Sequence, residues 1–438
     1  MRVVLIDPPN HCLSQPSASV QTHPLGLGYV AAALAVEHEV VQIVPDARTW
    51  APDEDIFEAI LDAALAQRPG LIGLTAVTAT WPSARELARR LRARSEVPIV
   101  LGGVHAAFRA EQCLEEPAID YLVRGEGEET AVALARALEG GGEPRSVPGL
   151  WGRDGGGIWR GPPLAPRANL DEIAPPRREG ILWEEHLQPA FYQSIITLRG
   201  CPYTCIYCSV PASSERKTRY RSAESVVSEI AELRERWRVP YLFFHDSVFT
   251  LHRKRTLAIL DGLIERGLRV PFACQTRTDR VDPELLERMK EAGCQQIFFG
   301  IESGHTESLR RMNKGMPLED IREAVGWVKA LGLRCAGFFM VGFPWETAEH
   351  LDATADFATT LDLDAVSLFS ATPLPGTALW DLDGGAGLPE SIDFRRPQVN
   401  LTRMTDADYA ARFNAMRERL DHYNQSVMTR AMAHWPRG

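Results

Sequence analysis

The stretch "ITLRGCPYTCIYC" (residues 196–208) decides how the second half of this chain is interpreted. It begins as a strand-like apolar run and continues into a loop with three cysteines, Cys201, Cys205 and Cys208, in the spacing C-x-x-x-C-x-x-C. A zinc site usually takes four nitrogen or sulfur ligands from two spaced pairs, and no second pair follows here. Three thiolates on one short loop suit a [4Fe–4S] cluster whose fourth iron stays open. Zinc ligation and purely structural cysteines remain the alternatives.

The composition is that of a soluble globular protein, with 45% hydrophobic and 24% charged residues among 438. No apolar run is long enough to span a membrane, and the N-terminal "MRVVLIDPPN" (1–10) reads as a strand rather than a signal peptide. We therefore expect a cytoplasmic protein with no membrane partner. The formal net charge of −10 disfavours nucleic-acid binding and suits a cationic small-molecule substrate. The cysteines outside the loop are scattered and read as small core residues.

The first part of the chain alternates short apolar runs with helical patterns. The apolar runs lie at 2–7, 38–44, 70–77, 97–103 and 119–125. Strands that are apolar throughout and joined by helices predict a parallel sheet covered on both faces. We expect a doubly wound, Rossmann-like α/β domain over residues 1–140, with its ligand outside the carboxyl ends of the strands. Residues 141–190 are rich in Gly and Pro and predict a linker, with a small hairpin around Trp151 and Trp159.

The rest of the chain alternates in the same way. Its apolar runs lie at 194–199, 241–246, 270–276, 295–303, 334–342 and 364–372. The helices between them carry clear end signals, as in "DPELLERMKEAG" (282–293), where Asp282 reads as the N-cap and Gly293 follows the last turn. Six βα units predict a partial (β/α)6 TIM-like barrel over 191–380, with reactive groups at the carboxyl ends of its strands. Residues 381–438 predict a helical C-terminal tail.

The cysteine motif resembles that of radical S-adenosylmethionine (SAM) enzymes, with an aromatic residue, Tyr207, directly before the last cysteine. Five further blocks resemble the same family and follow at successive strand ends: "FFHDSVF" (243–249), "CQTRTD" (274–279), "FFGIESG" (298–304), "GFFMVGFPWET" (337–347) and "TPLPGT" (372–377). The resemblance covers roughly residues 190–380. It implies that Cys201, Cys205 and Cys208 hold three irons of a [4Fe–4S] cluster and that SAM chelates the fourth. One electron then cleaves SAM to a 5′-deoxyadenosyl radical, which abstracts hydrogen from an unactivated carbon.

The same resemblance implies contacts to SAM at Tyr207, Ser247, Arg277, Glu302 and Gly342. Tyr207 is expected to pack on the adenine, and Gly342 to shape a turn that lets the backbone approach it. Ser247 belongs to "HDS" (245–247), which takes the place of the family's contact to the SAM amino group. Arg277 and Glu302 are expected to bind the carboxylate or ribose of SAM, with a salt bridge at the barrel mouth as the alternative.

The first domain resembles the cobalamin-binding domain that precedes some radical SAM domains. Its polar and Gly-rich loops, "DPPN" (7–10), "TAVTATWPS" (75–83) and "GGVHA" (102–106), follow strands, and "HPLGLGYVAAAL" (23–34) is similar to that subfamily. The resemblance implies that these loops cradle the corrin ring, through Pro8, Pro9, Thr75, Thr78, Gly102, Gly103 and His105. The chain lacks D-x-H-x-x-G, which puts His105 in doubt as a cobalt ligand and favours a role in pairing with backbone or phosphate. A domain that has lost its cofactor remains the alternative.

We expect a cobalamin-dependent radical SAM methylase that acts on a small natural-product intermediate, with a flavodoxin or ferredoxin as electron donor. The alternative is radical dehydration or deoxygenation of an aminosugar diol, as in aminoglycoside biosynthesis. That reaction needs an acid/base pair in the barrel, for which His245, Asp246 and Glu302 are the candidates. RNA modification is disfavoured because the C-terminal tail has no basic, aromatic platform. A purely structural role is disfavoured because an exposed cluster loop is costly to maintain.

Overall fold

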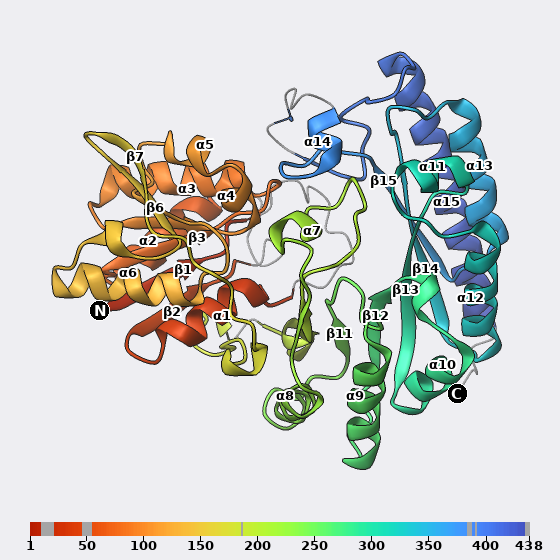
Figure 1. Cartoon of the computed structure of the whole chain (residues 1–438), viewed down its shortest axis with the longest axis horizontal. Helices are drawn as coiled ribbons and strands as arrows, with labels where there is room; N and C mark the ends of the chain where they lie inside the picture. The colour runs from red at the N-terminus through yellow and green to blue at the C-terminus, as the bar shows by residue number, and fades with distance from the viewer. Residues whose placement is uncertain (10–21, 46–54, 185–186, 383–387, 390–391, 434–438) are drawn as a thin grey trace. The chain divides into compact units, whose positions relative to one another are not determined.

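A computed structural model describes residues 1–9, 22–45, 55–184, 187–382, 388–389 and 392–433. The chain forms two compact units, which divide between Ser194 and Ile195. In Figure 1 the first unit runs from red to yellow and the second from green to blue. No helix in the described ranges is long and apolar enough to cross a membrane.

The first unit is built on a seven-stranded sheet of order β2-β1-β3-β4-β5-β6-β7. The first five strands of the chain pair in parallel and the last two antiparallel. The strands are β1 (Arg2–Ile6), β2 (Glu39–Ile43), β3 (Leu71–Thr75), β4 (Ile99–Gly102), β5 (Tyr121–Val123), β6 (Leu150–Asp154) and β7 (Gly157–Arg160). The strand order reverses between β1 and β3, and ligands of such sheets bind at this switch point.

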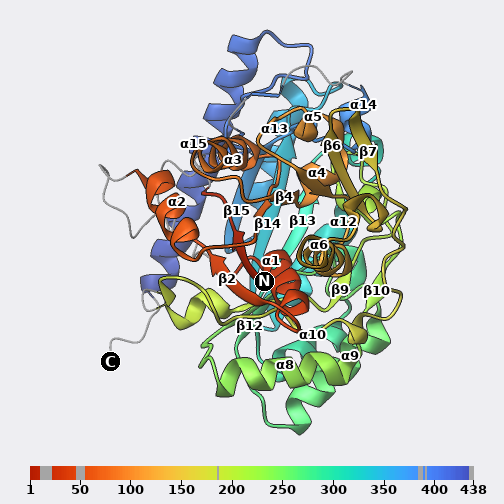
Figure 2. The same cartoon turned by 90° about the vertical axis from the view of Figure 1, so that its left-hand side faces the viewer.

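Helices cover both faces of this sheet. They are α1 (Leu25–Leu34), α2 (Ile56–Ala66), α3 (Trp81–Arg94), α4 (Val104–Phe108), α5 (Ala110–Leu114) and α6 (Glu128–Gly140), with short 3-10 turns at Pro144–Ser146, Leu170–Glu172 and Pro189–Tyr192. Helices α1 and α6 lie side by side on one face, and α2 and α3 pack on the other (Figure 2). Because both faces are covered, the strands are apolar throughout, as the sequence pattern predicts.

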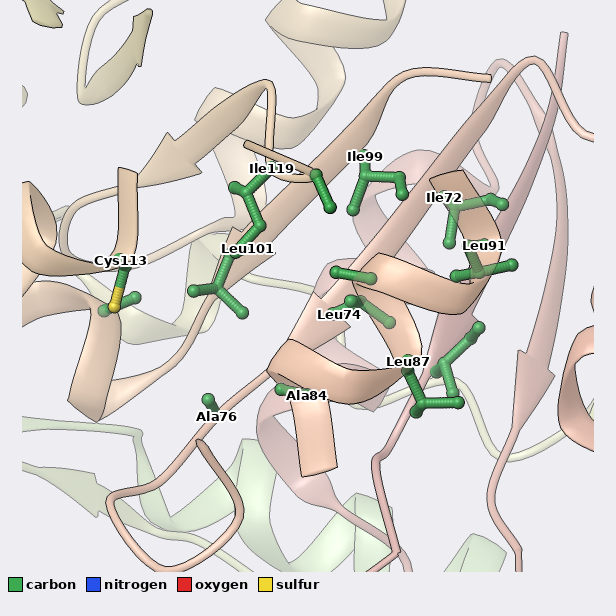
Figure 3. Packing of buried hydrophobic residues seen from close by; sticks show 14 of the residues in the cluster. Ile72, Leu74, Ala76, Ala84, Leu87, Leu91, Ile99, Leu101, Cys113 and Ile119 are labelled. Carbon is green, nitrogen blue, oxygen red and sulfur yellow. The ribbon is translucent and has the colours of Figure 1, made fainter. Parts of the chain in front are cut away.

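The core of the first unit packs α3 against the middle of the sheet. Leu87 and Leu91 of α3 contact the layer formed by Ile72 of β3 and Leu101 of β4, and all four side chains are fully buried (Figure 3). This close packing holds the strands in place. The loops that follow their carboxyl ends therefore begin at fixed positions.

The Gly- and Pro-rich stretch 141–190 does more than connect two domains. It supplies the hairpin predicted around Trp151 and Trp159, because β6, which contains Trp151, pairs with β7, which contains Trp159. Strand β6 also pairs with β5 and so extends the first sheet. The prediction of a linker did not include this extension of the sheet. A high density of Gly and Pro is typical both of loops and of the turns in short edge hairpins, so it does not distinguish the two.

The second unit holds a six-stranded sheet whose strands follow chain order, β8-β11-β12-β13-β14-β15, with parallel pairing from β11 onward. Its strands are β8 (Ser194–Ile195), β11 (Leu242–Phe244), β12 (Phe272–Thr276), β13 (Cys294–Glu302), β14 (Arg334–Val341) and β15 (Ala365–Ser370). A separate antiparallel pair joins β9 (Leu198–Arg199) to β10 (Arg219–Tyr220). The predicted fold class, a doubly wound sheet followed by a partial TIM-like barrel and a helical C-terminus, is confirmed.

The helices of the second unit alternate with its strands. They are α7 (Val210–Ser213), α8 (Ala223–Glu235), α9 (Arg253–Glu265), α10 (Pro283–Glu291), α11 (Thr306–Arg311), α12 (Leu318–Ala330), α13 (Ala348–Thr360), α14 (Ala378–Leu382) and α15 (Asp406–Ala433), with a 3-10 turn at Thr278–Arg280. The predicted N-cap of α10 is confirmed, because the Asp282 carboxylate accepts a hydrogen bond from Leu285 N at 2.9 Å. Gly293 follows that helix with φ +110°.

Helix α15 packs on the barrel instead of forming a separate tail. Its side chains Tyr409 and Phe413 are fully buried. The Tyr409 hydroxyl contacts Ser370 Oγ of β15 at 2.7 Å and donates to the Val341 carbonyl of β14 at 3.3 Å. Gly342, at the end of β14, has φ +103°, and a Cβ atom there would clash with this hydroxyl. The turn after β14 therefore requires glycine for both its backbone conformation and its close contact with α15.

We predict that Gly342→Ala lowers the free energy of unfolding of the second unit by about 3 kcal/mol, because left-handed strain and overpacking coincide there. Chemical denaturation measures this loss. The matched control is Gly326→Ala in α12, where a Cβ atom meets nothing within 4 Å. That variant should gain about 0.5–1 kcal/mol from helix propensity. Equal effects of the two substitutions would contradict this description of the turn.

Candidate functional site

The three cysteines lie on a loop that starts at the barrel's first strands and that we call the cluster loop (residues 200–209). Cys201 is buried, Cys205 and Cys208 are half-buried, and all three are free thiols. Strand β9 precedes this loop and β10 follows it, and the two strands pair with each other. Gly200 begins the loop with φ +92°, a conformation that glycine adopts without strain.

The surroundings of the loop cysteines disfavour their thiolate form in the absence of a metal. Burial, with a smaller contribution from the nearby Cys205 and Cys201, raises the pKa of Cys208 to about 11. Burial also raises the pKa of Cys201. A positively charged metal centre removes this cost, because it stabilises thiolates that otherwise repel one another. The donor set therefore fits an iron–sulfur cluster.

Among the residues that the structure describes, no three His, Cys, Asp or Glu side chains converge on a point where one metal ion would bind. A [4Fe–4S] cluster does not require such convergence, because each thiolate binds a different iron. The spread of Cys201, Cys205 and Cys208 along one loop is compatible with that arrangement.

A second segment, residues 312–316, runs beside the cluster loop and holds its backbone; we call it the clamp segment. Ile206 N donates to the Met312 carbonyl at 3.1 Å. The Cys205 thiol lies 3.8 Å from the Asn313 carbonyl oxygen. The clamp segment thus touches the loop at its central cysteine and at the residue after it, which fixes the loop before any cofactor binds.

Glu302 and Lys314 form a buried ion pair beneath the loop. Lys314 Nζ lies 2.9 Å from Glu302 Oε1, and the two side chains are 7% and 9% exposed. Lys314 Nζ also reaches the Tyr207 hydroxyl at 3.4 Å. Burial and the Glu302 charge raise the pKa of Tyr207 well above its usual range. The structure thus joins two of the predicted SAM-contact residues, Tyr207 and Glu302, in one network.

The local backbone is shaped to allow this pair. Glu302 has φ +72°, which is uncommon for a residue with a side chain, and the register between β13 and β14 shifts at this point. A Cβ atom at Gly300 would approach both Glu302 Oε1 and Lys314 Nζ to 2.8 Å. Gly300 therefore leaves the space in which the two charges meet. Strain of this kind is typical of functional sites.

Arg277 lies at the end of β12 and holds the other side of the cluster loop. Its guanidinium makes two 2.8 Å hydrogen bonds to Asp279 and donates to the Lys314 carbonyl at 2.9 Å. It also stacks on the Tyr203 ring, with 3.9 Å between the guanidinium carbon and the ring centroid. One guanidinium nitrogen, Nη1, is buried without a hydrogen-bond partner in the described chain. Most of this side chain positions the loop, and Nη1 is the atom left for a ligand.

The "HDS" residues after β11 point in two directions. His245 and Ser247 are exposed, whereas Asp246 is buried. The Asp246 carboxylate accepts hydrogen bonds from Thr197 N at 2.7 Å and Leu198 N at 3.0 Å. These contacts favour a role for Asp246 in holding the strand that leads into the cluster loop. Desolvation of its ring lowers the pKa of His245, although part of the side chain is exposed.

The turn after β14 is stabilised from within. Glu346 is buried and accepts hydrogen bonds from Gly342 N at 2.7 Å, Phe343 N at 3.1 Å and Ser308 Oγ at 3.0 Å. Burial raises the pKa of Glu346 to about 7. One side of Gly342 is occupied by Tyr409, as described above, so the remaining backbone of the turn is what can face a ligand.

In the first unit, the predicted cobalamin contacts gather at the carboxyl edge of the sheet. Pro8 and Pro9 follow β1, on one side of the switch point, and Thr75 ends β3 on the other. Gly103 has φ +95°, and a Cβ atom there would clash with the Ala76 backbone and approach the Thr75 hydroxyl to 2.9 Å. A Cβ atom at Gly102, by contrast, meets nothing within 4 Å. The edge is therefore open at Gly102 and closely packed at Gly103.

The side chains around this opening are partly apolar. Val77, after β3, and Val104, after β4, are 50% and 43% exposed. Exposed apolar side chains on two neighbouring loops suit a large, flat ligand such as a corrin ring. The opening at Gly102 provides the space for its approach, so these residues fit cobalamin.

The His105 side chain is buried at the carboxyl edge of the first sheet. Its Nδ1 pairs with Thr78 Oγ1 at 3.2 Å, and its ring stacks on Trp81 with 5.3 Å between centroids. Its Nε2 is buried and has no hydrogen-bond partner among the described residues. Burial lowers its pKa to about 4, so the ring is neutral. Because Nε2 is enclosed, these contacts favour a loop-positioning role over cobalt ligation for His105.

Each of the two units matches a known protein family. The radical SAM superfamily model matches residues 195–358, and the B12 binding domain model matches residues 17–135. An uncharacterized methyltransferase of Pyrococcus horikoshii is 33% identical over 399 residues, which is 90% of this chain and 86% of that protein. The chain therefore belongs to the radical SAM superfamily, in the group with a B12 binding domain ahead of the radical domain. It is an enzyme whose cofactors are a [4Fe–4S] cluster, SAM and cobalamin.

Two further proteins are similar to this chain. The anaerobic magnesium-protoporphyrin IX monomethyl ester cyclase of Rubrivivax gelatinosus is 29% identical over 448 residues, covering 100% of this chain and 79% of that protein. The radical SAM methyltransferase TsrM of Kitasatospora setae, solved with cobalamin and a [4Fe–4S] cluster, has a TM-score of 0.75 at 22% identity, covering 94% of this chain and 85% of that one. The second likeness shows the fold.

The sequence reasoning missed the residues that support the cluster loop. Lys314, Asn313 and Tyr203 contact the loop or lie in it, and none was a candidate. The signal available was weak: a lysine in "RMNKG" (311–315), after a short helix, reads as an ordinary surface residue. Only its burial in the fold distinguishes it.

We predict that Cys201→Ala, Cys205→Ala and Cys208→Ala each abolish cluster binding, as expected if the three thiolates are the protein ligands. Iron content and visible absorbance after anaerobic reconstitution measure this. Cys335→Ala, which removes a buried thiol within β14, is the matched control and should retain iron. Iron retained in any of the three loop variants would rule out the assigned ligand set.

We predict that Lys314→Met lowers the free energy of unfolding of the second unit by about 3–5 kcal/mol, because it leaves the Glu302 carboxylate buried and unpaired. Urea unfolding measures this, and the double variant Glu302→Gln/Lys314→Met should recover most of the loss. The control is Lys329→Met, which breaks a half-exposed pair with Asp364 at 2.7 Å and should cost no more than about 1 kcal/mol. Similar losses in the two lysine variants would contradict the role given to the buried pair.

Proposed function

We propose that this enzyme is a cobalamin-dependent radical SAM methylase that transfers a methyl group to an unactivated carbon of a small natural-product intermediate. The observation that carries the proposal is that one chain holds two fitting cofactor sites, each at the carboxyl edge of its own sheet. The edge in the first unit is open at Gly102 and lined by exposed valines. The Pyrococcus relative is also named a methyltransferase.

When bound, the cluster and SAM supply a 5′-deoxyadenosyl radical, and the cobalamin supplies the methyl group. The chain's own residues bind and orient these groups. Cys201, Cys205 and Cys208 hold the cluster, and Arg277 with its free Nη1 offers a cation to the SAM carboxylate. Glu302 presents an acceptor to the ribose or amino group, with Lys314 holding it in place.

The other SAM contacts complete this set. Tyr207 presents its ring to the adenine while its hydroxyl is anchored by the buried ion pair. Ser247, exposed after β11, presents a hydroxyl to the SAM amino group. These roles are the ones that the resemblance to the family implies for an aromatic residue in the cluster loop and for a residue after β11. The net charge of −10 suits a cationic substrate, and the chain is expected to act in the cytoplasm with a flavodoxin or ferredoxin as donor.

Radical dehydration or deoxygenation of an aminosugar diol is the second candidate. One observation favours it: His245 is an exposed imidazole directly after β11, the type of side chain that most often acts as a general base. Asp246 is tied to backbone amides, and Glu302 to Lys314, so His245 is the acid/base candidate with the greatest freedom.

The methyl transfer can be tested before the substrate is known. Enzyme loaded with reduced cobalamin and given SAM with a deuterated methyl group should form labelled methylcobalamin and S-adenosylhomocysteine, both measured by mass spectrometry. Gly102→Leu should abolish the label transfer, because its side chain fills the open edge, yet it should retain the cluster. Gly326→Ala, in the second unit, is the control that should transfer the label as the unmodified chain does. Absence of labelled cobalamin in the unmodified enzyme would favour the dehydration reaction.

A further inference from the structure

One face of the barrel sheet in the second unit is only half-buried. Helices α12, α13 and α15 pack on the other face (Figure 1). Over residues 296–300 of β13, 337–341 of β14 and 365–370 of β15, buried residues alternate with half-buried ones. Successive side chains of a strand point to opposite faces of a sheet, so the half-buried residues share one face. We call it the inner face, because it corresponds to the interior of a closed barrel.

Four phenylalanines form a continuous row across the inner face, which we call the aromatic row. They are Phe243 of β11, Phe298 of β13, Phe338 of β14 and Phe369 of β15, and all four are half-buried. The ring centroid of Phe298 lies 5.6 Å from that of Phe243 and 5.5 Å from that of Phe338. The centroids of Phe338 and Phe369 lie 6.0 Å apart. Each ring of the row therefore contacts the next.

Small side chains leave the space in which these rings meet. Ala273 of β12 pairs in register with Phe243, and Ala336 of β14 pairs in register with Phe298. Both alanines are buried. The rings of Phe243 and Phe298 thus approach each other across the intervening strand β12. Alternation of large and small residues at neighbouring positions is what allows such a layer to pack.

The orientation of the rings suits an aromatic ligand. The two central rings, Phe298 and Phe338, are nearly parallel, with 18° between their planes. The end rings are inclined to their neighbours, Phe243 by 59° and Phe369 by 63°. Aromatic rings associate best in offset-stacked or edge-to-face arrangements. The aromatic row presents rings in both orientations, and a saturated ring system gains nothing from them beyond apolar contact.

The aromatic row leads toward the cluster loop. Met340 follows Phe338 on the inner face of β14, two residues closer to the carboxyl end, and pairs in register with Phe369. Met340 also packs against the buried apolar cluster that contains Ile206 of the cluster loop. One end of the row thus lies beside the loop that holds the three cysteines.

We propose that the aromatic row is part of the substrate site and that the substrate is a flat aromatic small molecule. The inference rests on the proposed function, because it concerns the substrate of that reaction. The four phenyl rings offer a large apolar surface and no hydrogen-bonding group, and His245, whose ring lies 4.6 Å from that of Phe243, adds a polar contact at one end. A polyhydroxylated sugar fits poorly, because its hydroxyl groups would lose water without gaining partners.

The aromatic row is also a more specific guide to the substrate than the net charge. The value of −10 describes the whole chain and acts mainly on solubility and encounter. The row describes the face of the barrel that leads to the cluster loop. We therefore take the class of the substrate from the row.

The test measures how three small probes bind to the full chain, reconstituted with its cluster and cobalamin and supplied with SAM but no reductant. The probes are β-naphthol, its saturated counterpart β-decalol, and deoxystreptamine, a cationic aminocyclitol. Equilibrium dialysis measures the dissociation constant of each. The proposal predicts that β-naphthol binds at least ~5-fold more tightly than either of the others, because only β-naphthol gains ring–ring contacts.

Variants of two adjacent residues locate the binding site. Phe298→Leu removes one ring and keeps an apolar side chain, so it should weaken β-naphthol binding about 5-fold and leave β-decalol binding unchanged. Phe298→Tyr keeps the ring and should retain the affinity for β-naphthol. Phe299→Leu is the matched control, because Phe299 is fully buried on the opposite face of β13, and it should bind β-naphthol as the unmodified chain does. Iron content checks that each variant is folded.

Equal binding of β-naphthol and β-decalol, or no binding of β-naphthol, would overturn the proposal. Tighter binding of deoxystreptamine would overturn it in favour of the aminosugar. Equal losses in Phe298→Leu and Phe299→Leu would remove the aromatic row from the site. Failure of the proposed function is a separate result: β-naphthol would bind as predicted, and the methyl label of SAM would still not reach cobalamin.

Discussion

The ion pair between Glu302 and Lys314 is the contact on which the rest of the radical site depends. It joins the end of a central barrel strand to the segment that runs beside the cluster loop, and it reaches Tyr207 within that loop. Taking two charges out of water is costly, and a buried pair offsets that cost only when its geometry is favourable. The chain meets this condition with a left-handed Glu302 and with a glycine at position 300, where a side chain would collide with both charges. Because burying this pair is costly, we infer that it serves to fix the positions of the residues around it more than to stabilise the fold.

The clamp segment explains why one short loop can present three thiols in a fixed arrangement. Thiolates repel one another, and a loop with few internal hydrogen bonds would spread them apart. Backbone contacts from Met312 and Asn313, and the stacking of Arg277 on Tyr203, restrain the loop from two sides. Support by residues outside the ligand set is a general feature of metal sites, because ligand orientation sets affinity. The same logic holds in the first unit, where Thr78 and Trp81 fix His105 and leave Gly102 as the opening.

The sequence predicted most of the fold because its strands are buried on both faces and its helices have clear ends. Asp282, for example, caps α10 as expected from its place before a proline. The cysteine ligands were predictable because their spacing is local. Lys314 was not, because its role arises from contacts with Glu302 and Tyr207, far from it in sequence, and a lone lysine carries no signal of burial. For the same reason, the structural engagement of Asp246 with Thr197 and Leu198 became visible only once the strands were assembled.

The central claim is that this one chain binds both an iron–sulfur cluster and cobalamin. The most direct measurement is the iron and cobalt content of a single anaerobically purified sample, reconstituted with iron, sulfide and hydroxocobalamin and freed of unbound ligand. The account predicts about four iron atoms per chain, as in a [4Fe–4S] cluster, together with about one cobalt. Iron at that level without cobalt would contradict the methylase assignment and leave radical dehydration as the working model.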